Sequence, residues 1–328
     1  MASNVTEVWQ DARVIETVAL TPRIRRIVLD PALPIPVAPG AHIDARVHIE
    51  DVTDRRSYSV VDASRDGSSI AVSVFDSAVS RGGAGFMHAL VSGDHLEITQ
   101  PLVSFPLRIG APRYVLLAGG IGITAVSGMA ALLRSLGADY RLVYVGRERS
   151  SMAYLDELAA LHGDRLLVHV SGEGTPLTVH ALVGSVDAET ELYMCGPIRL
   201  MDSVRRAWVE RELPLPNLRF ETFGNSGWYA AQEFTVRIPG QGLEVTVGAD
   251  QTMLEALEAA GADMMFDCRK GECGLCEVRV LALDGDIDHR DVFYSERQKD
   301  ARSKLCCCVS RVVGSGPVGP ALISIESS

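Results

Sequence analysis

The sequence predicts a multidomain protein of mixed β and α/β class, with three parts in a row. Polarity alternates with a period of two through the N-terminal third, which is typical of half-buried strands. Short apolar runs then alternate with helical stretches, and strand patterns return in the C-terminal third. A length of 328 residues also suits two or three domains. We therefore place the domains at residues 1–110, 111–224 and 225–328.

The N-terminal domain is predicted to be an antiparallel β-barrel. Its short strands are separated by clusters of Pro, Gly and Asp, such as residues 31–40. The expected strands cover residues 24–29, 42–49, 56–61 and 69–75.

The middle domain is predicted to be a doubly wound parallel α/β sheet, because strand and helix patterns alternate along it. The expected strands cover residues 114–117, 141–145, 165–170 and 191–194, and the expected helices cover 125–136, 152–161 and 199–212. A short turn-rich linker is expected at 224–227. In the C-terminal domain we expect strands at 234–238, 243–247 and 277–281, with a helix at 253–260.

Composition and charge exclude several classes of protein. The net charge of −11 argues against nucleic acid or an anionic membrane as a partner. No apolar stretch is long enough to span a bilayer, and no export signal is evident at the N-terminus. Together with cysteines that look reduced, these features predict a cytoplasmic protein.

Six of the seven cysteines lie in the C-terminal domain and point to metal chemistry. Cys268, Cys273 and Cys276 have C-x4-C-x2-C spacing, and a run from Cys306 to Cys308 follows them. This is the plant-type ferredoxin pattern, in which thiolates hold a 2Fe–2S cluster. A zinc site usually pairs two C-x2-C motifs or adds histidines, and an odd number of cysteines disfavours a disulfide framework. The spacing therefore predicts one-electron transfer.

Two segments of the middle domain are candidate sites for a dinucleotide. Gly119, Gly120 and Gly122 lie between a strand and a helix, where backbone N–H groups and the helix dipole favour a pyrophosphate. Cys195, Gly196 and Pro197 follow another strand, at the edge where open α/β sheets bind ligands. The alternatives are a purely structural glycine turn and a tight turn with an inert buried cysteine.

Two segments of the barrel are candidate sites for an anionic ring compound. Arg56, Tyr58 and Ser59 place a cation, an aromatic ring and a hydroxyl on one expected strand. The segment from Arg81 to Gly83 offers a basic side chain and backbone N–H groups to a phosphate. The alternative for the first segment is an ordinary surface strand.

Occurring together and in this order, the five motifs resemble the phthalate dioxygenase reductase family. Its members are flavin and iron–sulfur reductases that supply electrons to Rieske oxygenases and O-demethylases. The resemblance covers essentially the whole chain. It implies a flavin-binding barrel, a nicotinamide-binding α/β domain and a C-terminal plant-type ferredoxin domain of β-grasp fold.

The resemblance also implies roles for the matching positions. Arg56, Tyr58 and Ser59 would hold the flavin ring, and Arg81, Gly82 and Gly83 would hold the phosphate of FMN. The dinucleotide would be bound by Gly119, Gly120, Gly122, Thr124, Gly196 and Pro197. Cys195 would lie near the site of hydride transfer, and Phe223 would stack on the flavin.

The fourth iron ligand must be chosen from three adjacent cysteines. In the family this ligand directly precedes Val-Ser-Arg, which implies Cys308. Residues two apart on an extended strand face the same side, so Cys306 is the rival, and Cys307 should face away.

The expected function is electron transfer from NADH through FMN and the 2Fe–2S cluster to a terminal Rieske-type oxygenase, by a reductase expected to be monomeric. NADH is favoured over NADPH because Glu173 follows the strand ending at Val170, and no arginine pair follows that strand. FMN, rather than FAD, is implied by the resemblance. The alternatives are a reductase for another acceptor, such as a cytochrome P450, and a redox-sensing regulator, which the acidic charge disfavours.

Overall fold

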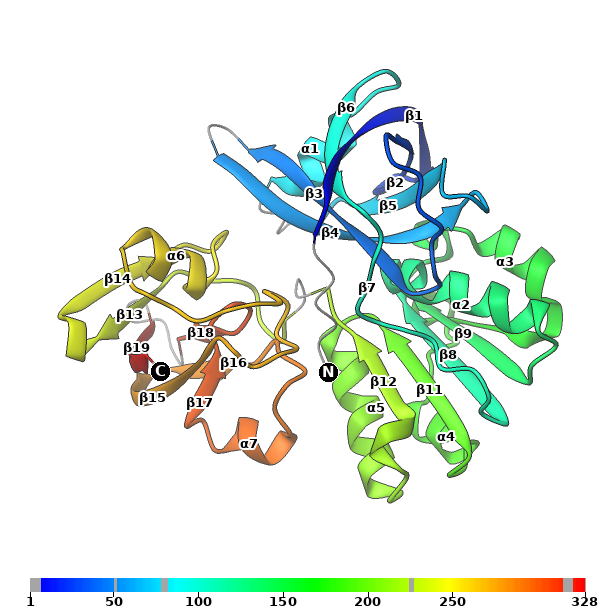
Figure 1. Ribbon diagram of the computed structural model, residues 1–328. Coiled ribbons are helices and arrows are strands. Elements are labelled where there is room, and N and C mark those ends of the chain that lie inside the picture. Colours follow the sequence, from blue (N-terminus) through cyan, green and yellow to red (C-terminus); the bar gives the residue numbers. More distant parts are fainter. Residues whose placement is uncertain (1–6, 50–51, 78–81, 224–226, 315–320, 328) are drawn as a thin grey trace. The chain divides into compact units, whose positions relative to one another are not determined.

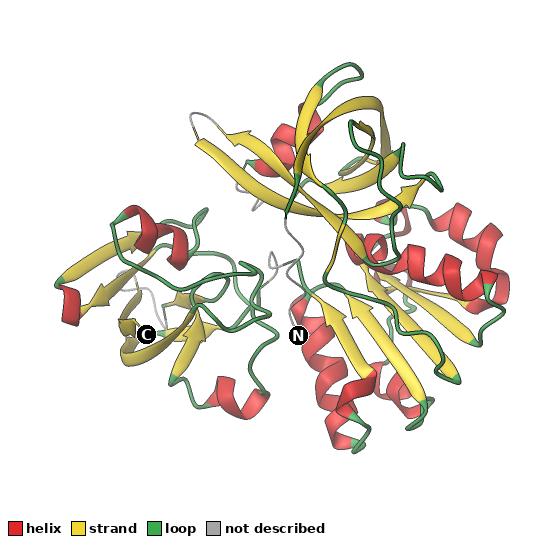
Figure 2. Ribbon diagram, viewed as in Figure 1, coloured by secondary structure: helices red, strands yellow, loops and turns green. Residues whose placement is uncertain are grey.

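The computed structural model describes residues 7–49, 52–77, 82–223, 227–314 and 321–327. Figure 1 labels the elements along the chain, and Figure 2 separates helices from strands. The chain divides into two compact units, formed by residues 1–196 with 207–221 and by residues 197–206 with 222–328. The predicted Arg81 and most of the predicted linker, residues 224–226, lie outside the described residues.

The first unit contains a closed antiparallel barrel. Its strands pair in the order β4-β5-β2-β1-β6-β3, and a further pairing of β3 with β4 closes the ring, while β7 adds to β3. The elements are β1 Trp9–Thr21, β2 Ile24–Pro31, β3 Ala41–Ile49, β4 Val52–Ala63, β5 Ile70–Phe75, β6 His95–Thr99, β7 Leu102–Val103 and helix α1 Gly83–Ala89. Alternate strand residues point inward, and the buried core contains Val14, Leu29, Ile43, Val47, Val72 and Ile98 from the strands and Met87 from α1.

The first unit also contains a five-stranded parallel sheet in the order β10-β9-β8-β11-β12. Its strands are β8 Arg113–Gly119, β9 Tyr140–Gly146, β10 Leu166–Val170, β11 Thr190–Cys195 and β12 Leu218–Glu221. The helices of this unit are α2 Ile123–Ser135, α3 Leu155–His162 and α4 Val179–Gly184, and they flank the sheet (Figure 2). Helix α5 Ile198–Glu210 begins in the second unit and ends in the first. The strand order reverses between β8 and β11, so the carboxyl ends of these two strands form the edge at which such sheets bind ligands.

The second unit contains a mixed sheet in the order β14-β13-β19-β15-β17, with a separate β16–β18 pair. Its elements are β13 Phe234–Ile238, β14 Leu243–Val247, α6 Met253–Ala259, β15 Glu277–Asp284, β16 Asp286–Asp288, α7 Glu296–Asp300, β17 Lys304–Cys306, β18 Arg311–Val313 and β19 Ala321–Ser327. Thr252 and Glu255 form a capping box that starts α6. The core combines Phe234, Leu254, Leu257 and Ile323 with the buried cysteines of the C-terminal run.

The predicted fold class is confirmed in all three parts. The prediction omitted β1, β6 and β7 of the barrel, α4 and β12 of the parallel sheet, and the short elements that follow β15. Among the described residues, no helix is both long enough and apolar enough to cross a membrane.

Candidate functional site

The barrel places Arg56 against the start of helix α1. A Cβ added to Gly83 would lie 3.1 Å from Cγ of Arg56, so the arginine stem covers this glycine. The guanidinium forms an ion pair with Asp54, and the arginine side chain as a whole is 19% exposed. Gly82 caps α1 with a φ of 87°, a conformation that favours glycine. The structure thus brings two predicted segments, Arg56 and Gly82 to Gly83, to one place.

The other two residues of the predicted ring site lie on opposite faces of β4. Side chains alternate along a strand, so Tyr58 shares a face with Arg56, whereas Ser59 faces the other way and is buried. Burial raises the pKa of the Tyr58 phenol, which keeps its hydroxyl protonated. Tyr58 can therefore offer both a ring face and a hydrogen-bond donor beside Arg56.

The glycine turn after β8 packs directly on the loop after β11. A Cβ on Gly122 would lie 2.1 Å from the carbonyl oxygen of Cys195, and a Cβ on Gly196 would lie 2.9 Å from Cα of Gly119. Gly120 has a φ of 56°, which also favours glycine. The backbones of the two loops are therefore in direct contact at the edge where β8 and β11 end. The glycine turn continues directly into α2.

Two predicted residues of this turn have buried side chains. Thr124 is 3% exposed, and its Oγ1 donates to the carbonyl oxygen of Ile121 at 2.9 Å, which stabilises the turn. Cys195 is 1% exposed at the end of β11. The geometry of Cys195 thus agrees with both the predicted place beside the ligand edge and the alternative of a buried structural thiol.

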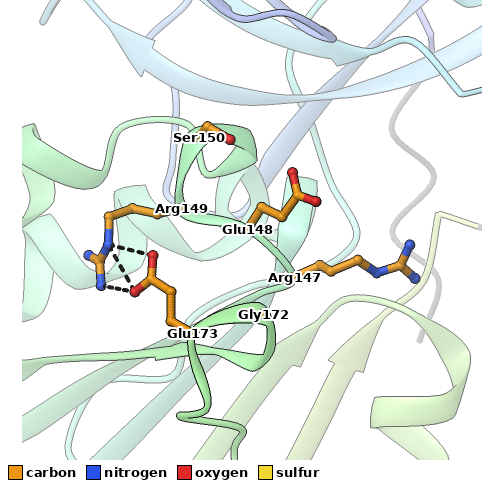
Figure 3. A pocket seen from close by; sticks show the side chains of 6 residues that line it. All are labelled: Arg147, Glu148, Arg149, Ser150, Gly172 and Glu173. Carbon is orange, nitrogen blue, oxygen red and sulfur yellow. Dashed lines mark hydrogen bonds and ion pairs between the residues drawn. The ribbon is translucent and has the colours of Figure 1, made fainter.

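A depression of about 420 Å³ lies at the carboxyl ends of β9 and β10 (Figure 3). Arg149 donates from Nη2 to Oε2 of Glu173 at 2.9 Å and from Nε to Oε1 at 3.2 Å. The N–H of Gly172 donates to the carbonyl oxygen of Arg147 at 2.8 Å, which joins the two loops. The residues that line the depression are Arg147, Glu148, Arg149, Ser150, Gly172 and Glu173.

Glu173 is predicted from the sequence, whereas Arg147 and Arg149 beside it are not. Glu173 follows strand β10, whereas Arg147 and Arg149 follow the neighbouring strand β9. The rule that ligands bind beyond the carboxyl ends of parallel strands would have found them, because Arg147 directly follows Gly146, the last residue of β9.

The cysteine loop of the second unit directs backbone N–H groups at a sulfur. The N–H groups of Lys270, Glu272 and Cys273 each lie 3.4 Å from Sγ of Cys268. Gly271 and Gly274 have φ values of 75° and 76°, so glycine is required for this path of the chain. The hydrogen bond with the Cys308 thiol, aided by these N–H groups, lowers the pKa of Cys268 to about 4.

The cysteine run places Cys308 between two ligands of the predicted motif. The Cys308 thiol hydrogen-bonds to both Cys268 and Cys276, whereas Cys306 and Cys307 each hydrogen-bond to Cys276. Strand β17 ends at Cys306, and residues 307–309 form a turn. The expectation of an extended strand through this run is therefore wrong. The alternation of side chains along a strand cannot decide between Cys306 and Cys308 as the fourth iron ligand.

Four thiols and three directed N–H groups fit the donor set of an iron–sulfur cluster. Here the thiols hydrogen-bond to one another, and within the described residues no three His, Cys, Asp or Glu side chains have their donor atoms spaced for a metal ion. The fit rests on residue types and on the N–H groups that converge on Cys268.

The remaining predicted residues belong to the second unit. Pro197 precedes α5 and accepts hydrogen bonds from the N–H groups of Leu200 and Met201. Phe223 is half-buried, and the N–H of the preceding Thr222 donates to Oε1 of Glu272 at 2.9 Å. The segment of Phe223 is thereby tied to the cysteine loop.

Comparisons with known proteins agree with this architecture. Residues 236–313 match the family model described as a 2Fe-2S iron-sulfur cluster binding domain. The carnitine monooxygenase reductase subunit of Acinetobacter pittii is 32% identical over 84% of this chain and 89% of its own length. The solved structure of phthalate dioxygenase reductase, titled as a modular structure for electron transfer from pyridine nucleotides to [2Fe-2S], matches with a TM-score of 0.71 and 26% identity over 98% of each chain.

An intact type IV self-sufficient cytochrome P450 monooxygenase also matches, with a TM-score of 0.66 and 34% identity over 97% of this chain and 41% of that chain. Several relatives of similar length are named as reductase subunits of monooxygenases, and another is named as a tetrachlorobenzoquinone reductase. The chain therefore belongs to the phthalate dioxygenase reductase family of flavin and iron–sulfur oxidoreductases.

Proposed function

We propose that the protein takes hydride from NADH and delivers single electrons to a terminal Rieske-type oxygenase. The observation that carries this proposal is the cysteine loop, where three N–H groups converge on Cys268 and Cys308 lies beside both Cys268 and Cys276. A flavin supplies the conversion of a hydride into single electrons, and a 2Fe–2S cluster supplies their onward transfer. The same chain holds a glycine turn suited to a dinucleotide.

In the first unit we assign a binding role to each predicted motif. Arg56 and the N–H groups from Gly82 to Gly83 would hold the phosphate side of FMN, with Tyr58 beside the ring. The turn with Gly119, Gly120 and Gly122 would bind the pyrophosphate of NADH, because its backbone is open to close approach at the start of α2. Cys195 and Phe223 would border the nicotinamide and the flavin ring.

In the second unit we assign the iron ligands to Cys268, Cys273, Cys276 and Cys308. Cys308 is preferred over Cys306 because its thiol contacts two other ligands instead of one. The N–H groups that point at Cys268 would stabilise the negative charge on a ligating sulfur and so raise the reduction potential of the cluster.

The experiment that tests this proposal is an anaerobic titration of the purified protein with NADH, followed by visible absorption and low-temperature EPR. We expect bleaching of flavin absorption together with a rhombic EPR signal from the reduced 2Fe–2S cluster. Acid extraction of the flavin and chromatography against FMN and FAD identify the flavin. Bleaching without the EPR signal would refute the electron path.

A cytochrome P450 is the second candidate acceptor, because a self-sufficient P450 contains a region 34% identical to nearly all of this chain. Stopped-flow reduction of a purified Rieske oxygenase component and of a P450 haem domain by the NADH-reduced protein separates the two. We expect the Rieske centre to be reduced faster, and faster reduction of the haem would reverse the assignment.

A further inference from the structure

A short segment of the second unit, residues 289–294, supports the middle of the cysteine loop. We call it the bridging segment, and it follows Asp288, the last residue of β16. The N–H of Val292 donates to the carbonyl oxygen of Gly271 at 3.0 Å. A Cβ added to Gly271 would lie 2.9 Å from Cα of Asp291, so the two backbones approach closely. The bridging segment therefore packs on the loop that carries the first three assigned iron ligands.

The bridging segment also contacts the part of the chain that carries the fourth assigned ligand. Ser310 lies two residues after Cys308 and is 1% exposed. Its Oγ donates to Oδ1 of Asp291 at 3.2 Å and accepts from the N–H of Arg290 at 3.3 Å. Asp291 thus connects the two ligand-bearing parts, with its backbone on the cysteine loop and its carboxylate on Ser310.

Asp291 is a buried carboxylate, with 0% of the residue exposed. Its Oδ1 also hydrogen-bonds to Nδ1 of His289 at 3.2 Å, and its Oδ2 accepts from the N–H of Tyr294 at 3.0 Å. Burial favours the neutral form, but the hydrogen bond with His289, the charge of Lys299 and the N–H of Tyr294 outweigh it, so the pKa of Asp291 is lowered. The carboxylate therefore carries a negative charge at neutral pH.

We propose that Asp291 is a positioning residue for the iron–sulfur cluster, which holds the Cys308 segment against the cysteine loop and lowers the reduction potential by its charge. This inference rests on the iron ligands of the proposed function. A negative charge opposes the addition of an electron nearby, and the interior of a protein screens that charge weakly. Asp291 therefore opposes the N–H groups that converge on Cys268, which favour the reduced state.

Asp291→Asn removes the charge and keeps the bridge. The amide oxygen can accept from the N–H of Tyr294, and the amide nitrogen can donate to Ser310 and His289, since a hydroxyl and an imidazole nitrogen can each accept instead of donate. We expect the equilibrium of one-electron reduction to shift toward the reduced cluster by roughly tenfold, equivalent to about 59 mV. A redox titration of the full chain, monitored by EPR, measures this shift.

Asp288→Asn is the control for the loss of a buried charge. Asp288 is 1% exposed, but its carboxylate accepts from Nε of Arg290 and from the N–H of Trp228, both at 2.8 Å. These partners lie outside the two ligand-bearing parts. The shift in reduction potential should therefore be clearly smaller in Asp288→Asn than in Asp291→Asn.

Ser310→Ala tests the bridge separately, because it removes the hydroxyl and keeps the charge of Asp291. We expect the 2Fe–2S absorption to decay severalfold faster than in the natural protein when an iron chelator is added, with a smaller shift in potential than in Asp291→Asn. Ser295→Ala is the control, since it removes a hydroxyl from the N-cap of α7, outside both ligand-bearing parts. Its cluster should decay at the natural rate.

The inference is overturned if Asp291→Asn leaves the potential unchanged or lowers it, or if Asp288→Asn raises it equally. It is also overturned if Ser310→Ala and Ser295→Ala lose the cluster at the same rate, or if Asp291→Asn holds no cluster although the amide keeps the bridge. Failure of the proposed function is distinct from these outcomes, because the natural protein would then show no 2Fe–2S EPR signal after chemical reduction.

Discussion

Gly122 shows how the absence of a side chain permits the close packing of the glycine turn. Its added Cβ would lie 2.1 Å from the carbonyl oxygen of Cys195, and backbone at this contact cannot rotate away as a side chain could. We expect Gly122→Ala to force the two loops apart, which lowers the melting temperature and weakens binding of 5′-AMP. Differential scanning calorimetry and titration calorimetry measure these two effects.

Gly128 is the matched control, because it lies on the same helix, α2, and has no close contact. An added Cβ there would lie 3.8 Å from Cα of Pro39, an ordinary van der Waals distance. Replacing a glycine inside a helix with alanine stabilises by about 1 kcal/mol, so Gly128→Ala should raise the melting temperature. Equal effects of the two substitutions would refute the steric role of Gly122.

Cys308 and Cys306 form a second comparison between single residues. Both are buried, at 3% and 0% exposure, so replacing either with serine should carry a similar cost in folding stability. We expect Cys308→Ser to abolish the 2Fe–2S absorption and EPR signals and Cys306→Ser to preserve them. The opposite result would make Cys306 the fourth ligand.

Strands β3 and β4 hold a buried carboxylate whose charge stabilises the barrel. Burial favours the neutral form of Asp44, but a hydrogen bond from Ser57 and the charges of His42 and Arg55 outweigh it, so the pKa of Asp44 is lowered. Arg55 Nε donates to Oδ2 of Asp44 at 2.9 Å. A lowered pKa in the folded state stabilises the protein above the unfolded pKa, and this contribution is lost as the pH falls through the folded value.

We therefore expect Asp44→Asn to reduce the free energy of unfolding by about 2 kcal/mol at neutral pH. The difference from the natural protein should shrink as the pH is lowered toward the folded pKa, because Asp44 itself then becomes neutral. Urea unfolding across this pH range measures both effects. Asp30→Asn is the control, since its ion pair with Arg13 is exposed and contributes about 0–1 kcal/mol. A pH-independent difference would contradict the electrostatic origin.

At the scale of elements, prediction succeeded where local pattern and burial coincide. In the parallel sheet, strand β8 is buried along nearly its whole length and β9 is buried from Leu142 to Tyr144, and their apolar runs were recognised. Strand β1 was missed because it is long and its register with β2 shifts between Val14 and Glu16, which interrupts the alternation. The turn at Cys307 was missed for a related reason: three identical residues carry no pattern.

At the scale of the whole molecule, the order of the three parts could be predicted because each part has its own hydrophobic pattern. The contacts that build the candidate site could not, since they join residues far apart in sequence. The approach of Gly122 to Cys195 and the pairing of Arg149 with Glu173 depend on how strands are ordered in the sheet. Local sequence predicts the strands but not which strand ends become neighbours.

The division of the chain into two units predicts that the two halves of the electron path can be separated by one substitution. Cys273 belongs to the second unit, whereas the predicted turn for NADH and the barrel belong to the first. Cys273→Ser should therefore leave reduction of the flavin by NADH at its natural rate, because none of the first unit's contacts changes. Stopped-flow absorption of the flavin measures this step.

Electron delivery to a protein acceptor should fall to background in the same variant, because the proposed route to the acceptor passes through the cluster. Reduction of cytochrome c measures this output, and a small-molecule acceptor that takes electrons directly from the flavin serves as the control. If output to cytochrome c persisted while the 2Fe–2S EPR signal was absent, electrons would leave from the flavin. The cysteine loop would then have another role, and the order of the two centres proposed above would be wrong.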